Sequence, residues 1–458
     1  MDTNADIFTL ANYGLSLIEQ KSQEVRCAEL FFEKNKYISI EIEENSVKNS
    51  ELGEDNGVGV RVVNRKGALG FAFSNKLIKP MIHELCITAL KMMNASTPDP
   101  DFDNFPKPYQ KYPTLKGLFD GNLKTLQVED SLDYVNQLID VCEQDKMAIS
   151  QSGSFISNYS KIFIFNSNGL EVSGKDTSCS LSSHIIVKDD VSKETSFGYE
   201  WQSERSLRNL NAVNIANTAL KEAKRNLNRK KIKNMKVPVI LTPKGTIQLI
   251  LRPIASAVNA ETFQYKRSYL VDKRDEFIGT KYLNIEDNGL IDGAIGSSIF
   301  DGEGVPCKNK KIFHKGKFLN TGLLHNSYTS TKEGTQSSGN ASRSSYSSIP
   351  SIGVTNFIMQ NSDIGINEII KDVKKGILFD YTGDTPNIST GDFSGLILHG
   401  NMIRNGEIKE PLNETMVGIN LMDLYKNIEA VSKEYKTYGA FQAPYTLVKD
   451  VQIIGGAS

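Results

Sequence analysis

Two β-hairpin patterns constrain the fold of this chain more than any other feature. In each, two apolar segments flank a four-residue turn that starts with asparagine and ends with glycine: residues 58–63 and 68–73 flank Asn64 to Gly67, and residues 161–165 and 170–172 flank Asn166 to Gly169. Apolar runs joined by such turns are typical of antiparallel strand pairs. The chain is therefore expected to contain an antiparallel sheet.

Helical segments and further strands surround these hairpins. Apolar residues recur every three or four positions in residues 7–18, 82–90 and 132–139, which predicts amphipathic helices. Residues 28–32 form an apolar strand candidate, and isoleucines alternate with polar residues over 38–43, which predicts a half-buried strand. This order of helices and strands predicts an α+β fold rather than a regular βαβ array.

A strongly basic stretch marks the predicted boundary between two domains. Residues 221–236 carry eight basic residues and one acidic residue, Glu222, and an apolar strand follows at 237–241. We predict an N-terminal α+β domain over residues 1–230 and a β-rich C-terminal domain over residues 231–458. The basic stretch is more typical of a solvated helix end plus linker than of a phosphate-binding patch.

Charge and cysteine content exclude several classes of protein. The 458 residues include 53 basic and 54 acidic side chains, a net charge of −1, without the basic excess of a dedicated nucleic-acid binder. The five cysteines are widely separated, which argues against a disulfide framework or a thiolate zinc site. No apolar run approaches the ~20 residues of a membrane span, and the acidic start has no basic n-region. We expect a cytoplasmic protein without membrane contact.

Two acidic, glycine-containing motifs are candidates for chemistry. Asp301 and Glu303 are one residue apart and precede Gly304; they could hold a hard cation, act in acid–base chemistry, or accept backbone hydrogen bonds in a tight turn. The second motif offers a capped turn, or a serine nucleophile without the usual glycine elbow, and comprises Thr390, Gly391, Asp392, Phe393 and Ser394. Spacing alone favours a turn in both.

A third motif starts like a zinc-binding helix. His83 and Glu84 match the first half of HExxH, in which two imidazoles one helical turn apart bind the metal. Ile87 stands where the second histidine is needed. We therefore predict an exposed polar helix face here.

Several short phrases occur in a characteristic order along nearly the whole chain. They are residues 56–62 and 70–73 in the first half, and residues 285–287, 300–306, 327–329, 338–341, 390–394 and 406–408 with Pro411 in the second. Together they resemble the TldD/PmbA family, whose PmbA branch is also called TldE and whose old label is modulator of DNA gyrase. By this resemblance the chain is identified as a PmbA/TldE-like member.

The resemblance implies a metal-dependent peptidase family that acts on peptides and partly unfolded chains. Its TldD-type members carry HExxxH on the helix after the first strand of the second domain, and a late cysteine completes the metal site. Here the corresponding helix, residues 246–258, contains neither His nor Glu, and Pro253 is expected to kink or divide it. No histidine lies between His184 and His314, and no cysteine follows Cys307.

The resemblance therefore implies the non-catalytic subunit of a TldD/TldE-type peptidase. We expect no metal in this chain, and zinc or another divalent metal in a TldD-type partner that carries HExxxH; a homodimer is the alternative. The substrate would be a peptide or an unfolded protein. The two acidic motifs, residues 301–304 and 390–394, are expected to line or brace the peptide path.

Two other functions stay open at this point. The chain could be an autonomous hydrolase with another nucleophile or metal set. It could also be a DNA- or gyrase-binding protein that uses residues 221–236, although nucleic acid is the less favoured partner.

Overall fold

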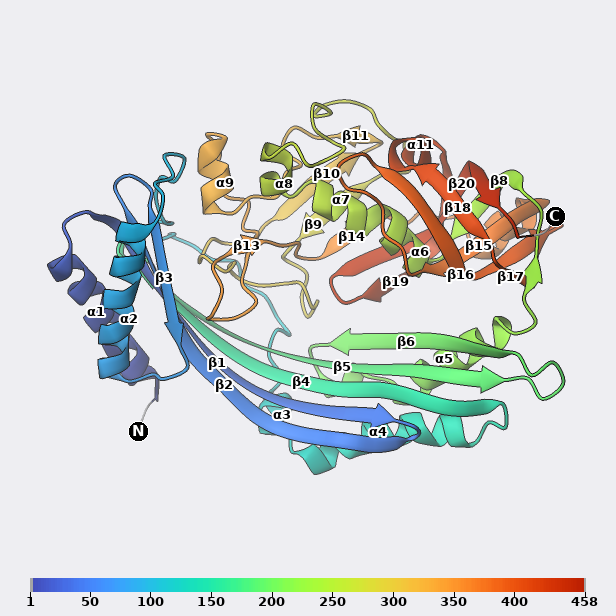
Figure 1. Ribbon diagram of the computed structural model, residues 1–458, viewed down its shortest axis with the longest axis horizontal. Coiled ribbons are helices and arrows are strands. Elements are labelled where there is room, and N and C mark those ends of the chain that lie inside the picture. The colour runs from blue at the N-terminus through green and yellow to red at the C-terminus, as the bar shows by residue number, and fades with distance from the viewer. Residues whose placement is uncertain (1–2, 457–458) are drawn as a thin grey trace.

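The first half of the chain forms one six-stranded antiparallel sheet. The computed structural model describes residues 3–456 (Figure 1). The order of strands in the sheet is β3-β2-β1-β4-β5-β6. Their bounds are β1 Val25–Glu43, β2 Ser46–Asn64, β3 Leu69–Ser74, β4 Ala148–Asn166, β5 Glu171–Lys188 and β6 Thr195–Glu204. The sheet confirms the predicted α+β fold and both predicted hairpins.

Helices cover one face of this sheet, and the second half of the chain lies against the other face (Figure 1). The covering helices are α1 Thr3–Lys21, α2 Lys79–Ala95, α3 Gly121–Thr125, α4 Val128–Glu143 and α5 Ala212–Arg225. Phe32 packs in the helix-side core, whereas its neighbour Phe31 packs with Phe300 from the second half. Because neighbouring strand residues point to opposite faces, burial on both sides explains the continuous apolar run at 28–32.

The sheet consists of two similar units. Each contains a helix, three antiparallel strands and a second helix: α1-β1-β2-β3-α2, then α4-β4-β5-β6-α5. One turn in each unit, between β2 and β3 or between β4 and β5, is closed by an asparagine side chain, Asn64 or Asn166, that accepts hydrogen bonds from backbone N–H groups two and four residues later. Each turn glycine has a positive φ, 83° at Gly67 and 85° at Gly169, which favours glycine over other residues.

The strands are longer than the sequence pattern suggests. The predicted segments 28–32 and 38–43 are parts of one strand, β1, and β2 begins twelve residues before Val58, at Ser46. The first part of β2 is polar and exposed, yet it stays paired with β1 along its length. Hydrogen bonding to a neighbouring strand thus extends the sheet where no hydrophobic pattern announces it.

The second half is a β-rich unit built around β8 (Met235–Leu241). This strand pairs in parallel with β15 (Lys375–Thr382) and in antiparallel with β20 (Phe441–Ile454). The other strands are β7 Lys230–Lys231, β9 Ile285–Asn288, β10 Asn309–His314, β11 Lys317–Phe318, β12 Ala341–Ser342, β13 Ser351–Ile352, β14 Phe357–Met359, β16 Asp392–Arg404, β17 Glu407–Asn413, β18 Met416–Asn420 and β19 Ile428–Tyr438. Short helices connect them: α8 Ala260–Gln264, α9 Ser327–Lys332, α10 Ile366–Asp372 and α11 Leu421–Lys426, and η1 Leu207–Asn209 precedes α5.

A helix with a π turn follows β8. It comprises α6 (Pro243–Thr246), the π turn η2 (Ile247–Leu251) and α7 (Arg252–Ala257). Pro253 has no backbone N–H to donate, and the N–H of Arg252 bonds to the carbonyl of Ile247, five residues back. The wider turn therefore accommodates the proline, and the helix is divided into three consecutive segments, as predicted from Pro253.

Two smaller expectations concern cysteines and membrane spans. All five cysteines are buried and carry free thiols, so no disulfide staples the fold. Among residues 3–456, no helix is long and apolar enough to cross a membrane.

The close approach of α5 to β6 depends on Gly198, and it can be tested by substitution. A Cβ at Gly198 would lie 1.9 Å from the carbonyl oxygen of Ala219 in α5. Gly198→Ala should therefore push α5 from the sheet and lower the free energy of unfolding by about 2–3 kcal/mol in a urea titration. Gly121→Ala is the matched control, because nothing lies within 4 Å of its Cβ. Equal stability of both variants would contradict this packing.

Candidate functional site

A cavity of about 580 Å³ lies between the two halves of the chain. The first half contributes residues of β5, β6 and α5, and the second half contributes the helix after β8 together with β15, β16 and β19. Its lining residues are His184, Phe197, Tyr199, Trp201, Glu222, Lys244, Ile247, Gln248, Arg252, Tyr381, Leu398, His399 and Tyr438. An aromatic wall with a few polar groups is the usual composition of a ligand site.

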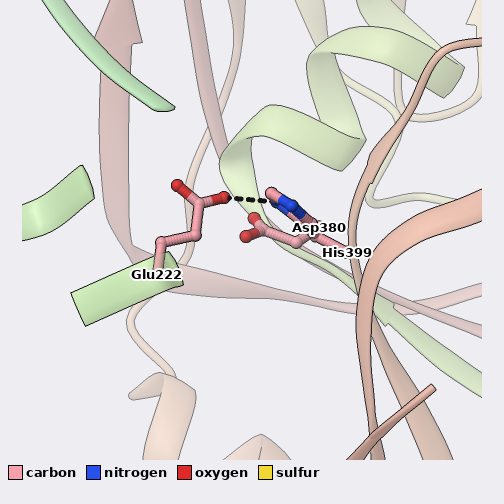
Figure 2. A group of neighbouring side chains, drawn as sticks. All are labelled: Glu222, Asp380 and His399. Atoms are coloured by element: carbon pink, nitrogen blue, oxygen red, sulfur yellow. Dashed lines mark hydrogen bonds and ion pairs between the residues drawn. The ribbon is translucent and has the colours of Figure 1, made fainter. Parts of the chain in front are cut away.

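His399 is the most deeply placed titratable group of this cavity. It lies on β16, is 2% exposed, and its Nδ1 is 3.0 Å from Oε1 of Glu222 on α5 (Figure 2). The ring of Phe197 packs 4.3 Å from the imidazole ring. Nε2 of His399 has no hydrogen-bond partner among residues 3–456. The carboxylate thus fixes one ring nitrogen of the imidazole, and the other ring nitrogen is buried without a partner among these residues.

Glu222 and Asp380 belong to a buried cluster of ion pairs. Lys244 on α6 places its Nζ 3.0 Å from Oε2 of Glu222, and Arg225 on α5 lies 2.8 Å from Asp380. Thr242, which caps α6, donates to Asp380 at 2.6 Å. These contacts connect α5 of the first half to β15 and α6 of the second half. Removing one partner would leave a buried charge uncompensated, so the cluster holds the cavity walls together.

The charges of this cluster shift two pKa values. Burial raises the pKa of Asp380, but Arg225 and Lys244 outweigh it and hold this pKa at about 2. Burial lowers the pKa of Lys244, but Glu222, Asp380 and Glu200 outweigh it and raise the pKa. Both groups therefore stay charged near neutral pH. Burial and the neighbouring His399 also lower the pKa of His184.

One trio in the cluster has metal-binding side chains. The ligand atoms of Glu222, Asp380 and His399 lie within 4.8 Å of one another (Figure 2). Their number suits a zinc ion with one open position. However, the ammonium of Lys244 and the guanidinium of Arg225 already neutralise the two carboxylates. The residues present therefore do not fit a tightly bound divalent metal, which would have to displace Lys244.

The helix after β8 presents cations to the cavity instead of metal ligands. Lys244, Gln248 and Arg252 are spaced four residues apart and line the same wall. Leu251 and Ile254 point into the hydrophobic core. The side chain of Gln248 exchanges hydrogen bonds with the backbone of Thr382, so it fastens the helix to β15.

The first predicted motif lies elsewhere, in the seam between the two halves. Asp301 accepts backbone hydrogen bonds from Glu303, Val305 and Ala341, and burial with the nearby Glu303 carboxylate raises the pKa of Asp301 to about 7. Glu303 is 1% exposed and lies 3.0 Å from Arg61 of β2. The carboxylates therefore brace the loop and the seam.

Further buried contacts complete this seam. Arg61 also pairs with Glu29 at 3.0 Å, and Arg343 pairs with the same Glu29. Gly304 has a φ of 82°, in the left-handed region that favours glycine, and its carbonyl accepts a hydrogen bond from Tyr112. Asp301 also borders a cleft of about 440 Å³ between the halves.

The second predicted motif is an exposed turn that leads into β16. Asp392 accepts a hydrogen bond from Asn420 at 2.9 Å, and hydrogen bonds from Asn420 and Thr390 lower its pKa. Gly391 has a φ of 78°. Phe393 is buried in the core, whereas Thr390 and Ser394 are exposed. Within the described part of the chain, no hydrogen bond or ion pair joins this turn to Asp301 or Glu303.

Glu222 and His399 were not predicted as functional residues, although one signal was present. Glu222 is the only acid in residues 221–236, and it falls on the buried face of α5 with Ile215 and Ala219. A carboxylate on the apolar stripe of an amphipathic helix calls for a buried partner. Nothing in the local pattern around His399 marks it.

Four of the eight basic residues of the stretch at residues 221–236 are paired with acidic side chains. Lys224 pairs with Asp145, Arg229 with Glu194 at 2.8 Å, and Lys231 with Glu414 at 2.7 Å. These pairs, together with Arg225 and Asp380, halve the number of basic side chains that could contact a phosphate backbone. His83 lies on the exposed face of α2 and contacts the hydroxyl of Tyr13 at 2.8 Å, as the prediction of a polar helix face requires.

The lowered pKa of Asp380 predicts that the protein loses part of its stability in acid. Because this pKa is lowered from about 3.9 in the unfolded chain to about 2, its stabilisation is complete above pH ~4 and is lost as the pH falls towards 2. Asp380→Asn should reduce the free energy of unfolding by about 2–3 kcal/mol at pH 7, and the deficit should shrink between pH 4 and pH 2 in urea titrations. Asp133→Asn, at an exposed position, is the control. A deficit independent of pH would contradict the ion-pair explanation.

Comparison with known proteins agrees with the sequence resemblance. Profiles described as PmbA/TldA metallopeptidase domain 1, central domain and C-terminal domain match residues 28–91, 121–227 and 234–455. An uncharacterized protein of Methanocaldococcus jannaschii is 30% identical, over 87% of this chain and 89% of its own length. A metalloprotease PmbA homolog of Buchnera aphidicola is 27% identical over 93% of each chain.

A solved structure has the same fold. TldE from Thermococcus kodakarensis superimposes with a TM-score of 0.85 at 21% identity, over 98% of this chain and 100% of that one. At this identity the likeness concerns the fold alone. The profiles and the M. jannaschii relative carry the assignment of the sequence. This chain belongs to the PmbA/TldD metallopeptidase family.

Proposed function

We propose that this chain is the non-catalytic, PmbA/TldE-type subunit of a TldD/TldE-type peptidase. In this proposal it helps to enclose a peptide or unfolded protein while a TldD-type partner supplies the metal. One observation carries the proposal. The helix after β8, where TldD-type members have HExxxH, presents Lys244, Gln248 and Arg252 to the cavity.

The electrostatics of the cavity support this assignment. A divalent ion beside Lys244 and Arg252 would meet two like charges within a partly buried space. The trio of Glu222, Asp380 and His399 is already neutralised by internal cations. The chain keeps the fold of the family, but its side chains at this place suit an anionic or neutral ligand better than a metal.

The other two functions have less support. An autonomous hydrolase that works through a covalent intermediate needs a nucleophile such as serine or cysteine, and the lining of the cavity around His399 includes neither. A DNA-binding role needs free basic side chains, whereas four of the eight basic residues at 221–236 are paired with carboxylates.

Metal content and partner dependence test the proposal directly. The tag-free chain, purified without added metal, should contain no stoichiometric transition metal by elemental analysis, and it should not cleave unfolded protein. A TldD-type paralogue with HExxxH should co-elute with it on size exclusion, and the mixture should be active. About one zinc per chain, with chelator-sensitive proteolysis by this chain alone, would overturn the proposal.

The two predicted motifs should respond differently to substitution. Asp392 is exposed, so Asp392→Ala should lower turnover by the reconstituted pair severalfold while complex formation persists. Glu303 is buried against Arg61, so Glu303→Gln should instead lower the free energy of unfolding by about 3 kcal/mol. Asp363→Ala, at another exposed position, is the control for Asp392. Unchanged turnover with Asp392→Ala would remove this turn from the peptide path.

A further inference from the structure

We propose that the cavity between the two halves binds the carboxylate end of a peptide whose last side chain is large and apolar. This inference rests on the proposed function, because it assigns one part of a peptide path to this subunit. It depends on three groups of residues that line the cavity: a cation without a carboxylate partner, an aromatic wall, and a buried imidazole with a free nitrogen.

Arg252 is the group that would bind the carboxylate. It lines the cavity from the first turn of α7, and its guanidinium lies 5.9 Å from the centre of the Phe441 ring. Among residues 3–456, no carboxylate is within 4.0 Å of this guanidinium, whereas Lys244 on the same wall is held by Glu222 at 3.0 Å. A guanidinium binds a planar carboxylate through two parallel hydrogen bonds. The guanidinium of Arg252 is therefore free to form such a pair of hydrogen bonds with a bound carboxylate.

The aromatic wall would take the last side chain. Phe197, Tyr199 and Trp201 follow one another on the same side of β6, and Tyr381 and Tyr438 face them from the second half. The rings of Trp201 and Tyr438 are 5.6 Å apart. A cavity of about 580 Å³ with this lining has room for a large apolar side chain and the chain end that carries it. Contact with the aromatic rings would bury the apolar surface of this side chain and so favour binding.

His399 supplies the remaining polar contact. Its Nδ1 is 3.0 Å from Oε1 of Glu222, and in the tautomer with the proton on Nδ1 the other nitrogen, Nε2, is a hydrogen-bond acceptor. The imidazole is 98% buried, and Nε2 has no partner within the described chain. A buried polar atom without a partner costs free energy, and the N–H of a bound peptide would remove this cost.

A phosphate group fits the same cavity less well. Phosphate sites usually gather several cations or backbone N–H groups, often at a helix N-terminus. Here one cation is free, and most of the lining is aromatic or aliphatic. One guanidinium beside a large apolar surface matches a single carboxylate joined to an apolar side chain.

The chain carries its own reporter for this test. Trp201 is the only tryptophan of the sequence, and it lines the cavity, so its fluorescence reports occupancy directly. We would titrate the isolated full-length chain with three probes: a penta-alanine peptide extended by a C-terminal phenylalanine as the free acid, the same peptide as the C-terminal amide, and N-acetylphenylalanine. Calorimetry would run in parallel.

The expected result is saturable binding of the free acid, with affinity at least tenfold above that of the amide and of N-acetylphenylalanine. Arg252→Gln should reduce the free acid to the affinity of the amide, and Arg252→Lys should keep part of the difference. Arg208→Gln, at an exposed position of η1, is the matched control and should change nothing. Circular dichroism would verify that each variant is folded.

Any of three results would overturn the inference. The free-acid peptide could show no saturable binding by fluorescence and calorimetry, it could bind with the same affinity as the amide, or its affinity could be unchanged in Arg252→Gln. Binding of N-acetylphenylalanine as tight as that of the peptide would show a site for a small aromatic acid instead. None of these results bears on metal content or on co-elution with a TldD-type partner, so a failure here and a failure of the proposed function are distinguishable.

Discussion

The arrangement of the two halves depends on buried charges that cross between them. At one end, Glu222 of α5 contacts Lys244 of α6 and His399 of β16. At the other end, Arg61 of β2 contacts Glu303, from a loop of the second half. A buried charge that loses its partner is costly, so each pair disfavours any other placement of the halves. Hydrophobic contacts such as Phe31 with Phe300 add burial but specify the geometry less strictly.

Local sequence chemistry was sufficient to predict the hairpins but not the length of the strands. Asn64 and Gly67 perform in the structure the roles that their types suggest, because a turn is decided within a few residues. The polar start of β2 could not be predicted in this way. It is a strand because β1 lies beside it, and this pairing joins residues that the hydrophobic pattern does not relate.

Residues of compact motifs could be predicted from the sequence, whereas cavity residues that are far apart in the sequence could not. Asp301 and Glu303 are recognisable in the sequence because they form a compact motif, and the structure gives them partners in the loop and across the seam. The glycines at positions 57 and 59 belong to another such motif, and they let the segment around Tyr346 approach β2 closely. The cavity residues come from strands and helices far apart in the chain, so only the fold brings Glu222, Lys244 and His399 together. Of these three residues, only Glu222 could be recognised in the sequence, because it is an acidic residue on the apolar face of a helix.

Lys244 shows how the cavity can keep its shape without a metal. Two carboxylates and an imidazole within 4.8 Å would repel or protonate if no positive charge stood among them. The ammonium of Lys244, with the guanidinium of Arg225, supplies that charge from within the chain, and the low pKa of Asp380 reflects it. The repulsion between the acidic groups is therefore offset by cationic side chains of the same chain. A chain built in this way can hold its cavity in shape under any metal supply, and Arg252, which has no carboxylate partner among residues 3–456, can bind a ligand instead.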